Sequence, residues 1–236
     1  MKCLPLDSRA IEYHVVRSKR LKTSEIIVEP ERVVVRTPFY KTAEEVDKMV
    51  KRKADWIERK RFEYQQLVSQ IRRPSFEPDS TIPYLGKNYP LRMLAGHDAG
   101  KIQFDGREFF VTISSQRRST KAIKVLYEAW LMEEAGRVFE NIVRRRCVQL
   151  GVRPRQVLVK KLKRRWGSAT KSNVLNFNFN LAKAPIDVID YVVLHELAHL
   201  RIRNHSHRFW SLVREFMPNY KHRQSWLSNN SVGLVE

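Results

Sequence analysis

The sequence predicts an α+β fold, and three observations lead to that prediction. Short segments rich in β-branched and aromatic residues recur through residues 11–115, with turn residues between them. The stretch at 119–150 repeats apolar residues at helical spacing over its whole length. Two further strand-like segments then precede a helix at 185–200. We therefore expect a β-rich N-terminal module with one helix at 1–115, followed at 116–236 by a small β-sheet packed on helices.

The composition is that of a globular protein with a strongly basic surface. Of the 236 residues, 42% are hydrophobic, and 45 Lys and Arg stand against 25 Asp and Glu, which gives a net charge of +20. This charge favours anionic partners such as nucleic acid, nucleotides or acidic proteins. The alternative is a basic surface that is solvated and binds no such partner.

The same sequence favours a cytoplasmic protein without a membrane partner. Its two cysteines, Cys3 and Cys147, are too few for a disulfide framework. The N-terminus becomes polar before an apolar segment of signal-peptide length has formed. No run approaches the roughly 20 apolar residues that cross a membrane.

The N-terminal module is expected to consist mainly of strands joined by short turns. Pro30-Glu31 and Asp105-Gly106 lie between pairs of apolar segments and predict hairpin turns. Thr42 precedes a glutamate, Glu45, at the spacing of a capping box, and opens a helix expected at 42–66. Residues 68–83 lack periodicity and predict a linker or long loop. Strands are expected at residues 11–16, 25–29, 32–37, 84–94, 100–104 and 108–113.

The C-terminal half is expected to place a strand pair between two long helices. Ser119 begins the first helix and Gly151 ends it near residue 150. Residues 156–162 form one strand. Residues 174–181 alternate apolar residues with asparagines, which predicts a half-buried strand antiparallel to the first. Its asparagines are expected to face away from the core: Asn176, Asn178 and Asn180.

The helix at 185–200 carries the strongest indication of chemistry. His195 and His199 are four residues apart, so both imidazoles lie on one face about one turn apart and can reach one zinc ion. Glu196 beside them is then placed to take a proton from a metal-bound water. Apolar residues surround this polar group, and buried His and Glu are costly unless something pairs them.

A catalytic zinc needs a third protein ligand and leaves its fourth position to water. The candidates that follow in the sequence are His205, His207 and Glu215. Apolar residues at 209, 212, 213 and 216 define the inner face of a second short helix. Extending its pitch backwards puts His205 near that face and His207 on the opposite side. We therefore predict His205 as the third ligand and His207 as an exposed residue at the start of the helix.

At this point the C-terminal half resembles a known family. The segments that carry the resemblance are Arg165-Trp-Gly-Ser168, the strand at 175–181, the helix segment 188–200 and Asn204-His-Ser-His-Arg-Phe-Trp210. Together they resemble the YgjP-like metallopeptidase family, and the run 205–209 is similar to the His-Gly-x-x-Phe segment of the related SprT-like zinc proteases. The N-terminal half, including Tyr84-Leu-Gly-Lys-Asn-Tyr-Pro90, resembles the same family.

This resemblance implies a minimal zincin-like fold with His195, His199 and His205 as zinc ligands and Glu196 as catalytic base. One departure is Ser206-His207, where SprT-like proteins have Gly and often Pro. The departure does not affect a ligand. Members of the family are peptidases by motif, while some are classed as UTP pyrophosphatases.

Three functions follow as hypotheses. The first is a zinc metallopeptidase, whose peptide substrate adds as a strand to a sheet edge, with the segment 174–181 as a candidate edge. The second is a UTP pyrophosphatase using Mn²⁺ or Mg²⁺, for which the cationic run 160–165 would bind phosphates. The third is a nucleic-acid-associated protein, either with a structural zinc or as a DNA-recruited protease of the SprT-like type. Glu196 argues against a purely structural zinc, because such a site has no use for a base.

Overall fold

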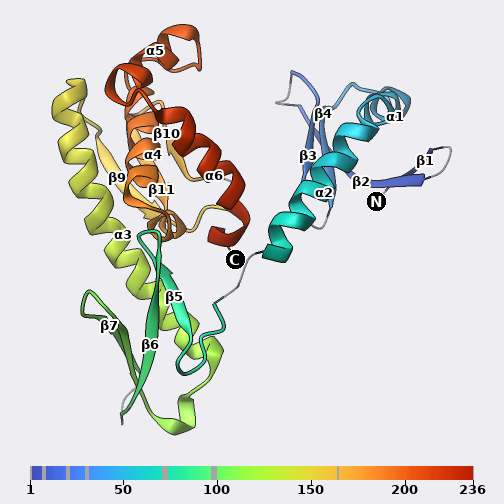
Figure 1. The fold of residues 1–236 in the computed structure, drawn as a ribbon. Coiled ribbons are helices and arrows are strands. Elements are labelled where there is room, and N and C mark those ends of the chain that lie inside the picture. The colour runs from blue at the N-terminus through green and yellow to red at the C-terminus, as the bar shows by residue number, and fades with distance from the viewer. Residues whose placement is uncertain are drawn as a thin grey trace. The chain divides into compact units, whose positions relative to one another are not determined.

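The computed structural model describes residues 2–6, 9–19, 22–29, 32–70, 74–96, 100–163 and 165–235. It confirms a mixed α+β fold with small sheets and helices (Figure 1). Contacts divide the chain into two compact units, Met1–Arg72 and Arg73–Glu236. No helix in the described part of the chain is long and apolar enough to span a membrane.

The first unit is a four-stranded sheet with two consecutive helices. Its strand order is β1-β2-β4-β3, in which β2 and β4 are parallel and the outer pairs antiparallel. The expected hairpin is the antiparallel pair β3–β4, whose flanking residues Glu29 and Arg32 exchange backbone hydrogen bonds. Pro30 and Glu31 themselves lie outside the described residues. The strands are β1 (Lys2–Leu6), β2 (Arg9–Ser18), β3 (Glu25–Val28) and β4 (Val33–Pro38).

The single helix expected at 42–66 is two helices, α1 (Ala43–Arg52) and α2 (Ala54–Gln70). Thr42 and Glu45 form the expected capping box at the start of α1. Lys53 lies between the helices with φ −104° and ψ 11°, although its N–H still donates to the Met49 carbonyl and its own carbonyl accepts from Ile57 N–H. Apolar residues of both helices bury against the sheet: Val46, Val50, Ala54 and Ile57.

The second unit contains two sheets, of which the first has the order β5-β6-β8-β7. The pair β7–β8 forms the expected hairpin, and Gly106 in its turn has φ +97°, a conformation that glycine adopts without strain. These strands are β5 (Thr81–Tyr84), β6 (Lys87–Ala95), β7 (Lys101–Phe104) and β8 (Phe109–Ile113), and the short 3₁₀ turn η1 (Ser115–Arg117) follows them.

A long helix, α3 (Thr120–Leu150), is the spine of the second unit. Ser119 caps its N-terminus and Gly151, in the left-handed conformation, ends it, as expected. Figure 1 shows β6 and β7 towards its first half, and the second sheet with α4 along its second half. The remaining elements are β9 (Gln156–Lys160), β10 (Gly167–Ala169), β11 (Val174–Asn178), η2 (Phe179–Lys183), α4 (Ile186–Ala198), α5 (His207–Phe216) and α6 (Tyr220–Val235).

The second sheet differs from the predicted strand pair in three respects. Its order is β10-β11-β9, and β11 pairs parallel with β9, so the expected antiparallel pairing was wrong. Because β11 is the central strand, the segment 174–181 is not a sheet edge, and its last residues form η2 instead of strand. The asparagines expected to face solvent are buried: Asn176, Asn178 and Asn180.

The division after Arg72 places residues 73–115 with the C-terminal half, whereas the sequence suggested a boundary after residue 115. The reason is that the β5–β6 turn packs against η2. The backbone N–H groups of Leu85 and Gly86 donate to the carbonyls of Ala182 and Lys183, both at 2.9 Å. One hydrophobic core also runs from β5 through α3 to α6. The four strands β5–β8 therefore belong to the same folded body as α4.

A buried ion pair joins α3 to α4. Arg146 is 8% exposed and donates from Nε and Nη2 to the two carboxylate oxygens of Asp190, at 2.8 and 2.7 Å. It also donates from Nη1 to the side chain of Gln149 at 2.8 Å and the carbonyl of Phe216 at 3.3 Å. This bidentate geometry fixes the start of α4 against the spine of the unit.

We expect Asp190→Asn to lower the free energy of unfolding by about 3–5 kcal/mol, because it leaves the Arg146 guanidinium buried without its counter-charge. The matched control is Glu140→Gln, which removes a carboxylate from the exposed pair with Arg144 and should cost no more than about 1 kcal/mol. Urea unfolding of the metal-free variants measures both. Equal losses would contradict a special role for the buried pair.

Candidate metal centre

The site is built on the last turn of α4, which is otherwise apolar. The apolar residues of this part of the helix are buried: Val192, Val193, Leu194, Leu197 and Ala198. Their packing fixes the rotation of the helix about its axis. His195 lies in the last turn and His199 is the C-cap residue, one turn later on the same face. The chain then makes two short turns, in which Leu200 N–H donates to Leu197 and Arg201 N–H to Ala198.

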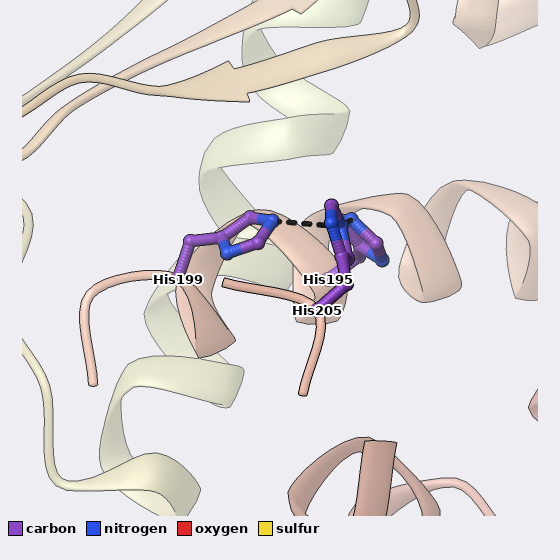
Figure 2. Close-up of side chains that lie close together, drawn as sticks. All are labelled: His195, His199 and His205. Carbon is purple, nitrogen blue, oxygen red and sulfur yellow. Dashed lines mark hydrogen bonds between the residues drawn. The ribbon is translucent and has the colours of Figure 1, made fainter. Parts of the chain in front are cut away.

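The structure brings the three predicted histidines together. Their Nε2 atoms converge, with 3.1 Å between those of His199 and His205 and 3.0 Å between those of His205 and His195. One nitrogen from each ring lies within 4.8 Å of the other two, a grouping that could hold a metal ion. Figure 2 shows His195 and His199 rising from α4, and His205 reaching the same point from the loop that follows.

The hydrogen bonding of the rings fits a cation at this point. His199 Nδ1 lies 3.1 Å from the carbonyl oxygen of Ile202, which can only accept, so Nδ1 carries the proton and Nε2 presents a lone pair. The Nε2 atoms of His195 and His205 lie close to this lone pair, so a cation could be held between the three rings. Tetrahedral zinc with Zn–N bonds of about 2.0–2.1 Å separates its nitrogen ligands by about 3.3 Å, close to the distances found here.

Burial and neighbouring rings disfavour the charged forms of the two helix histidines, His195 and His199, in the metal-free protein. Burial lowers the pKa of His195 to about 3, and the neighbouring His199 and His205 lower it further in the same direction. Burial also lowers the pKa of His199, although the bond to Ile202 opposes this. Only the neutral imidazole binds metal, so His195 and His199 are in the form that can bind a cation at neutral pH. His195 Nδ1 is buried and has no hydrogen-bond partner among the described residues.

Glu196 is packed between its helix and the edge strand β10. It is 7% exposed, and burial raises the pKa of its carboxyl to about 7, against the lowering effects of the Ala169 backbone N–H and the charge of Arg165. A Cβ atom on Gly167 would lie 2.7 Å from Glu196 Cγ and 2.9 Å from Oε1. The glycine at the start of β10 thus leaves the space that the carboxylate occupies.

Gly167→Ala is therefore expected to displace the Glu196 carboxylate and lower the turnover number by roughly 10²-fold, the cost of misplacing a reacting group by about 1 Å. The metal affinity should stay within a factor of about two, since the three atoms nearest to the new methyl group all belong to Glu196. The matched control is Gly136→Ala, because a Cβ there meets no atom within 4 Å. Loss of metal from Gly167→Ala would contradict this account. Turnover and metal titration together test it.

Comparisons with known proteins show the family to which the chain belongs. The model of one family, described as "YgjP-like, metallopeptidase domain", matches residues 22–230. The chain belongs to the YgjP-like family. The match covers both units, so the resemblance seen in the sequence is confirmed over most of the chain.

Two solved structures are similar to part of this YgjP-like chain. The metallopeptidase zymogen of Pyrococcus abyssi abylysin is 22% identical, with a TM-score of 0.36, and the match covers 38% of this chain and 90% of that one. The metallopeptidase zymogen of Methanocaldococcus jannaschii jannalysin is 20% identical, with a TM-score of 0.36, over 39% of this chain and 95% of that one. Among curated proteins, no match is found.

Aromatic residues that sequence reasoning did not single out surround the histidines of this YgjP-like domain. Trp210 stacks on His205, with 5.6 Å between the ring centroids and 25° between the ring planes. Trp210 also stacks on Tyr220, with a centroid distance of 5.3 Å and an interplanar angle of 15°. Tyr220 stacks in turn on Tyr191, whose ring meets that of His195. The contacts hold the exposed His205 against α5 and α6. The only signal in the sequence was an aromatic residue near each histidine, which does not distinguish this stack from ordinary core.

The remaining candidates lie away from the three Nε2 atoms. His207 is exposed at the first position of α5, as expected, and its ring lies 3.4 Å from the hydroxyl of Ser211. Glu215 is exposed on the same helix. Neither belongs to the grouping of nitrogens described above, which leaves His205 as the third member of the group.

Proposed function

We propose that this YgjP-like domain is a zinc-dependent peptidase of minimal zincin-like fold. His195, His199 and His205 would hold the ion, and Glu196 would act as catalytic base. The observation that carries the proposal is the convergence of three imidazole Nε2 atoms beside a buried carboxylate at a sheet edge. An all-nitrogen donor set favours zinc over Mg²⁺ or Ca²⁺, which prefer oxygen ligands.

The ion, when bound, would supply Lewis acidity that lowers the pKa of a water molecule and polarises the carbonyl of the scissile bond. Glu196 would act in two steps of the reaction, first as a base and then as an acid. Its carboxylate accepts the proton of the attacking water and returns it to the leaving amine. The buried setting that raises the pKa of Glu196 in the metal-free protein favours uptake of a proton by this carboxylate.

The substrate would be held by β10 instead of the segment 174–181. β10 pairs with β11 on one side only, so its other edge has no sheet partner among the described strands, and there the Ala169 N–H donates to the Glu196 carboxylate. A peptide that adds to this edge as a further strand passes Glu196, which packs directly on Gly167. This arrangement brings a peptide bond to the base without any dedicated side-chain pocket.

Hydrolysis of nucleoside triphosphates is the second candidate, and the cations near β10 favour it. Phosphate groups are bound by Lys and Arg, and several lie in the run 160–165, of which Arg164 falls outside the described residues. A pyrophosphatase would, however, need Mn²⁺ or Mg²⁺ held mainly by oxygen ligands. Three imidazoles are a poor match for those ions.

The test compares the two substrates on one metal-loaded sample. Purified protein, first stripped of metal and then reloaded with Zn²⁺ or Mn²⁺, is offered a set of unfolded polypeptides and, separately, UTP. We expect new peptide termini with Zn²⁺ and no pyrophosphate from UTP. Pyrophosphate release that is lost in Glu196→Gln, without peptide cleavage, would replace the peptidase by the pyrophosphatase.

A further inference from the structure

The segments that build the site carry almost no negative charge. Residues 141–186, which include all of β9, β10 and β11, contain no Asp or Glu, and neither do residues 197–214. Between these segments the helix α4 contributes three carboxylates. Asp187 and Asp190 are paired with Arg223 at 3.0 Å and Arg146 at 2.7 Å. Glu196 is therefore the one carboxylate of these segments without a salt-bridge partner among the described residues.

Cations bracket the edge strand β10 at both ends. Arg165 is exposed two residues before β10, and its charge acts on the Glu196 carboxyl. Beyond the other end, the turn at 170–173 carries the exposed Lys171. Arg203 is fastened to the same turn, because its guanidinium donates to the carbonyl of Thr170 at 2.7 Å and to the side chain of Asn173. We call Arg165, Lys171 and Arg203 the cationic rim.

On the basis of the proposed peptidase function, we propose that the cationic rim selects polypeptides with acidic side chains on both sides of the scissile bond. A strand added to β10 extends past Arg165 in one direction and past Lys171 and Arg203 in the other. Side chains two residues apart on such a strand point to the same face, so a short acidic segment can meet both ends of the rim. Basic side chains at those positions would meet charge of the same sign with no carboxylate to compensate.

The surroundings of the rim favour a polypeptide over a nucleic acid strand. Single-stranded nucleic acid is held by cations together with exposed aromatic rings on which bases stack. In the described part of the second unit, the exposed large hydrophobic residues are all aliphatic: Leu94, Val125, Met132, Val148 and Ile186. The aromatic residues near the rim are engaged, since Trp166 packs against the core and Trp210 is stacked between His205 and Tyr220. A free strand edge, in contrast, recognises polypeptide backbone.

The test uses three internally quenched peptides with one central sequence, flanked on both sides by Glu, Gln or Lys. With the zinc-loaded protein at low salt, we expect kcat/KM to be about tenfold higher for the Glu peptide than for the Gln peptide, and lowest for the Lys peptide. The difference should appear mainly in KM and shrink as the salt concentration rises. Binding of the labelled Glu and Gln peptides to Glu196→Gln, measured by anisotropy, should show the same order without turnover.

Variants assign the preference to the rim. Lys171→Gln and Arg165→Gln should each reduce the ratio of Glu to Gln peptide cleavage by a factor of about three, and Arg165→Glu should shift it towards the Lys peptide. The ratio is the readout, because the Arg165 charge also acts on Glu196 and changes cleavage of every peptide alike. The control is Arg153→Gln, an exposed cation of the same acid-free segment that lies outside the rim and should leave the ratio unchanged.

The outcomes separate this inference from the function on which it rests. Equal, Glu196-dependent cleavage of all three peptides would overturn the acidic preference and leave the peptidase intact. No Glu196-dependent cleavage of any peptide would overturn the peptidase itself. A single-stranded oligonucleotide that blocks cleavage of the Glu peptide, and loses this effect in Lys171→Gln, would assign the rim to nucleic acid and overturn the proposal.

Discussion

Glu196→Gln is expected to lower kcat/KM for peptide cleavage by about 10²–10⁴-fold, the usual contribution of a positioned acid–base group. Glutamine has nearly the same shape and can still accept the hydrogen bond from Ala169, so the packing against Gly167 is kept. It cannot accept a proton. The loss should therefore appear in kcat, with little change in KM or in the amount of metal bound.

Stability provides the control for this variant. Burial raises the pKa of Glu196 to about 7, above its ordinary value near 4.5, so in metal-free protein the folded state holds a proton that the unfolded chain releases. The contribution of Glu196 to stability is present below about pH 4.5 and is lost as the pH rises to about 7. Metal-free Glu196→Gln should thus be at least as stable as the parent chain at pH 8, and the difference should vanish towards pH 4. An inactive variant that unfolds more readily at pH 8 would contradict this explanation.

Features set by local sequence could be predicted, because the interactions that decide them lie within a few residues. The capping box of Thr42 and Glu45 and the left-handed Gly151 at the end of α3 both form as expected. The grouping of His195, His199 and His205 is of the same kind. Two of the rings are fixed by helical spacing, and the third comes from the loop just before the next amphipathic helix.

The pairing of β11 could not be predicted in the same way. Its alternation of apolar residues and asparagines indicates one solvated face only if nothing covers the asparagines. In the structure Asn178 is 1% exposed and donates from its side chain to the carbonyl of Leu162 at 2.8 Å, while its side-chain oxygen accepts from Asn180 N–H. Asn178 thus satisfies backbone groups of the connection before β10 and of η2, a role that the pattern of alternation does not reveal.

Contacts between segments that are distant in the sequence could not be predicted either. Nothing separated Arg146 from its neighbours Arg144 and Arg145, yet only Arg146 is buried against Asp190. Likewise, the packing of Glu196 on Gly167 joins residues of different elements that no periodicity relates. The candidate metal-binding residues were therefore visible in the residue types, whereas the packing around Glu196 was not.

His205→Ala is expected to lower zinc affinity by more than about 10²-fold. Mutation of a residue that only hydrogen-bonds to a metal ligand typically costs roughly 10–100-fold, and loss of a ligand itself should cost more. The variant keeps only two histidine ligands, His195 and His199, and two ligands bind zinc more weakly than three. The variant should fold normally, since His205 is exposed and contributes little to the core. Zinc affinity is measured by competition with a chromogenic chelator.

Two further variants make this test specific to the third ligand. His207→Ala removes an exposed imidazole two residues away and should leave zinc affinity unchanged, because its ring lies outside the group of converging nitrogens. His205→Asp should recover part of the lost affinity, since a carboxylate oxygen can also bind zinc. Full zinc affinity in His205→Ala, or an equal loss in His207→Ala, would remove His205 from the metal centre. The base at Glu196 would then face a site whose third ligand comes from elsewhere in the chain.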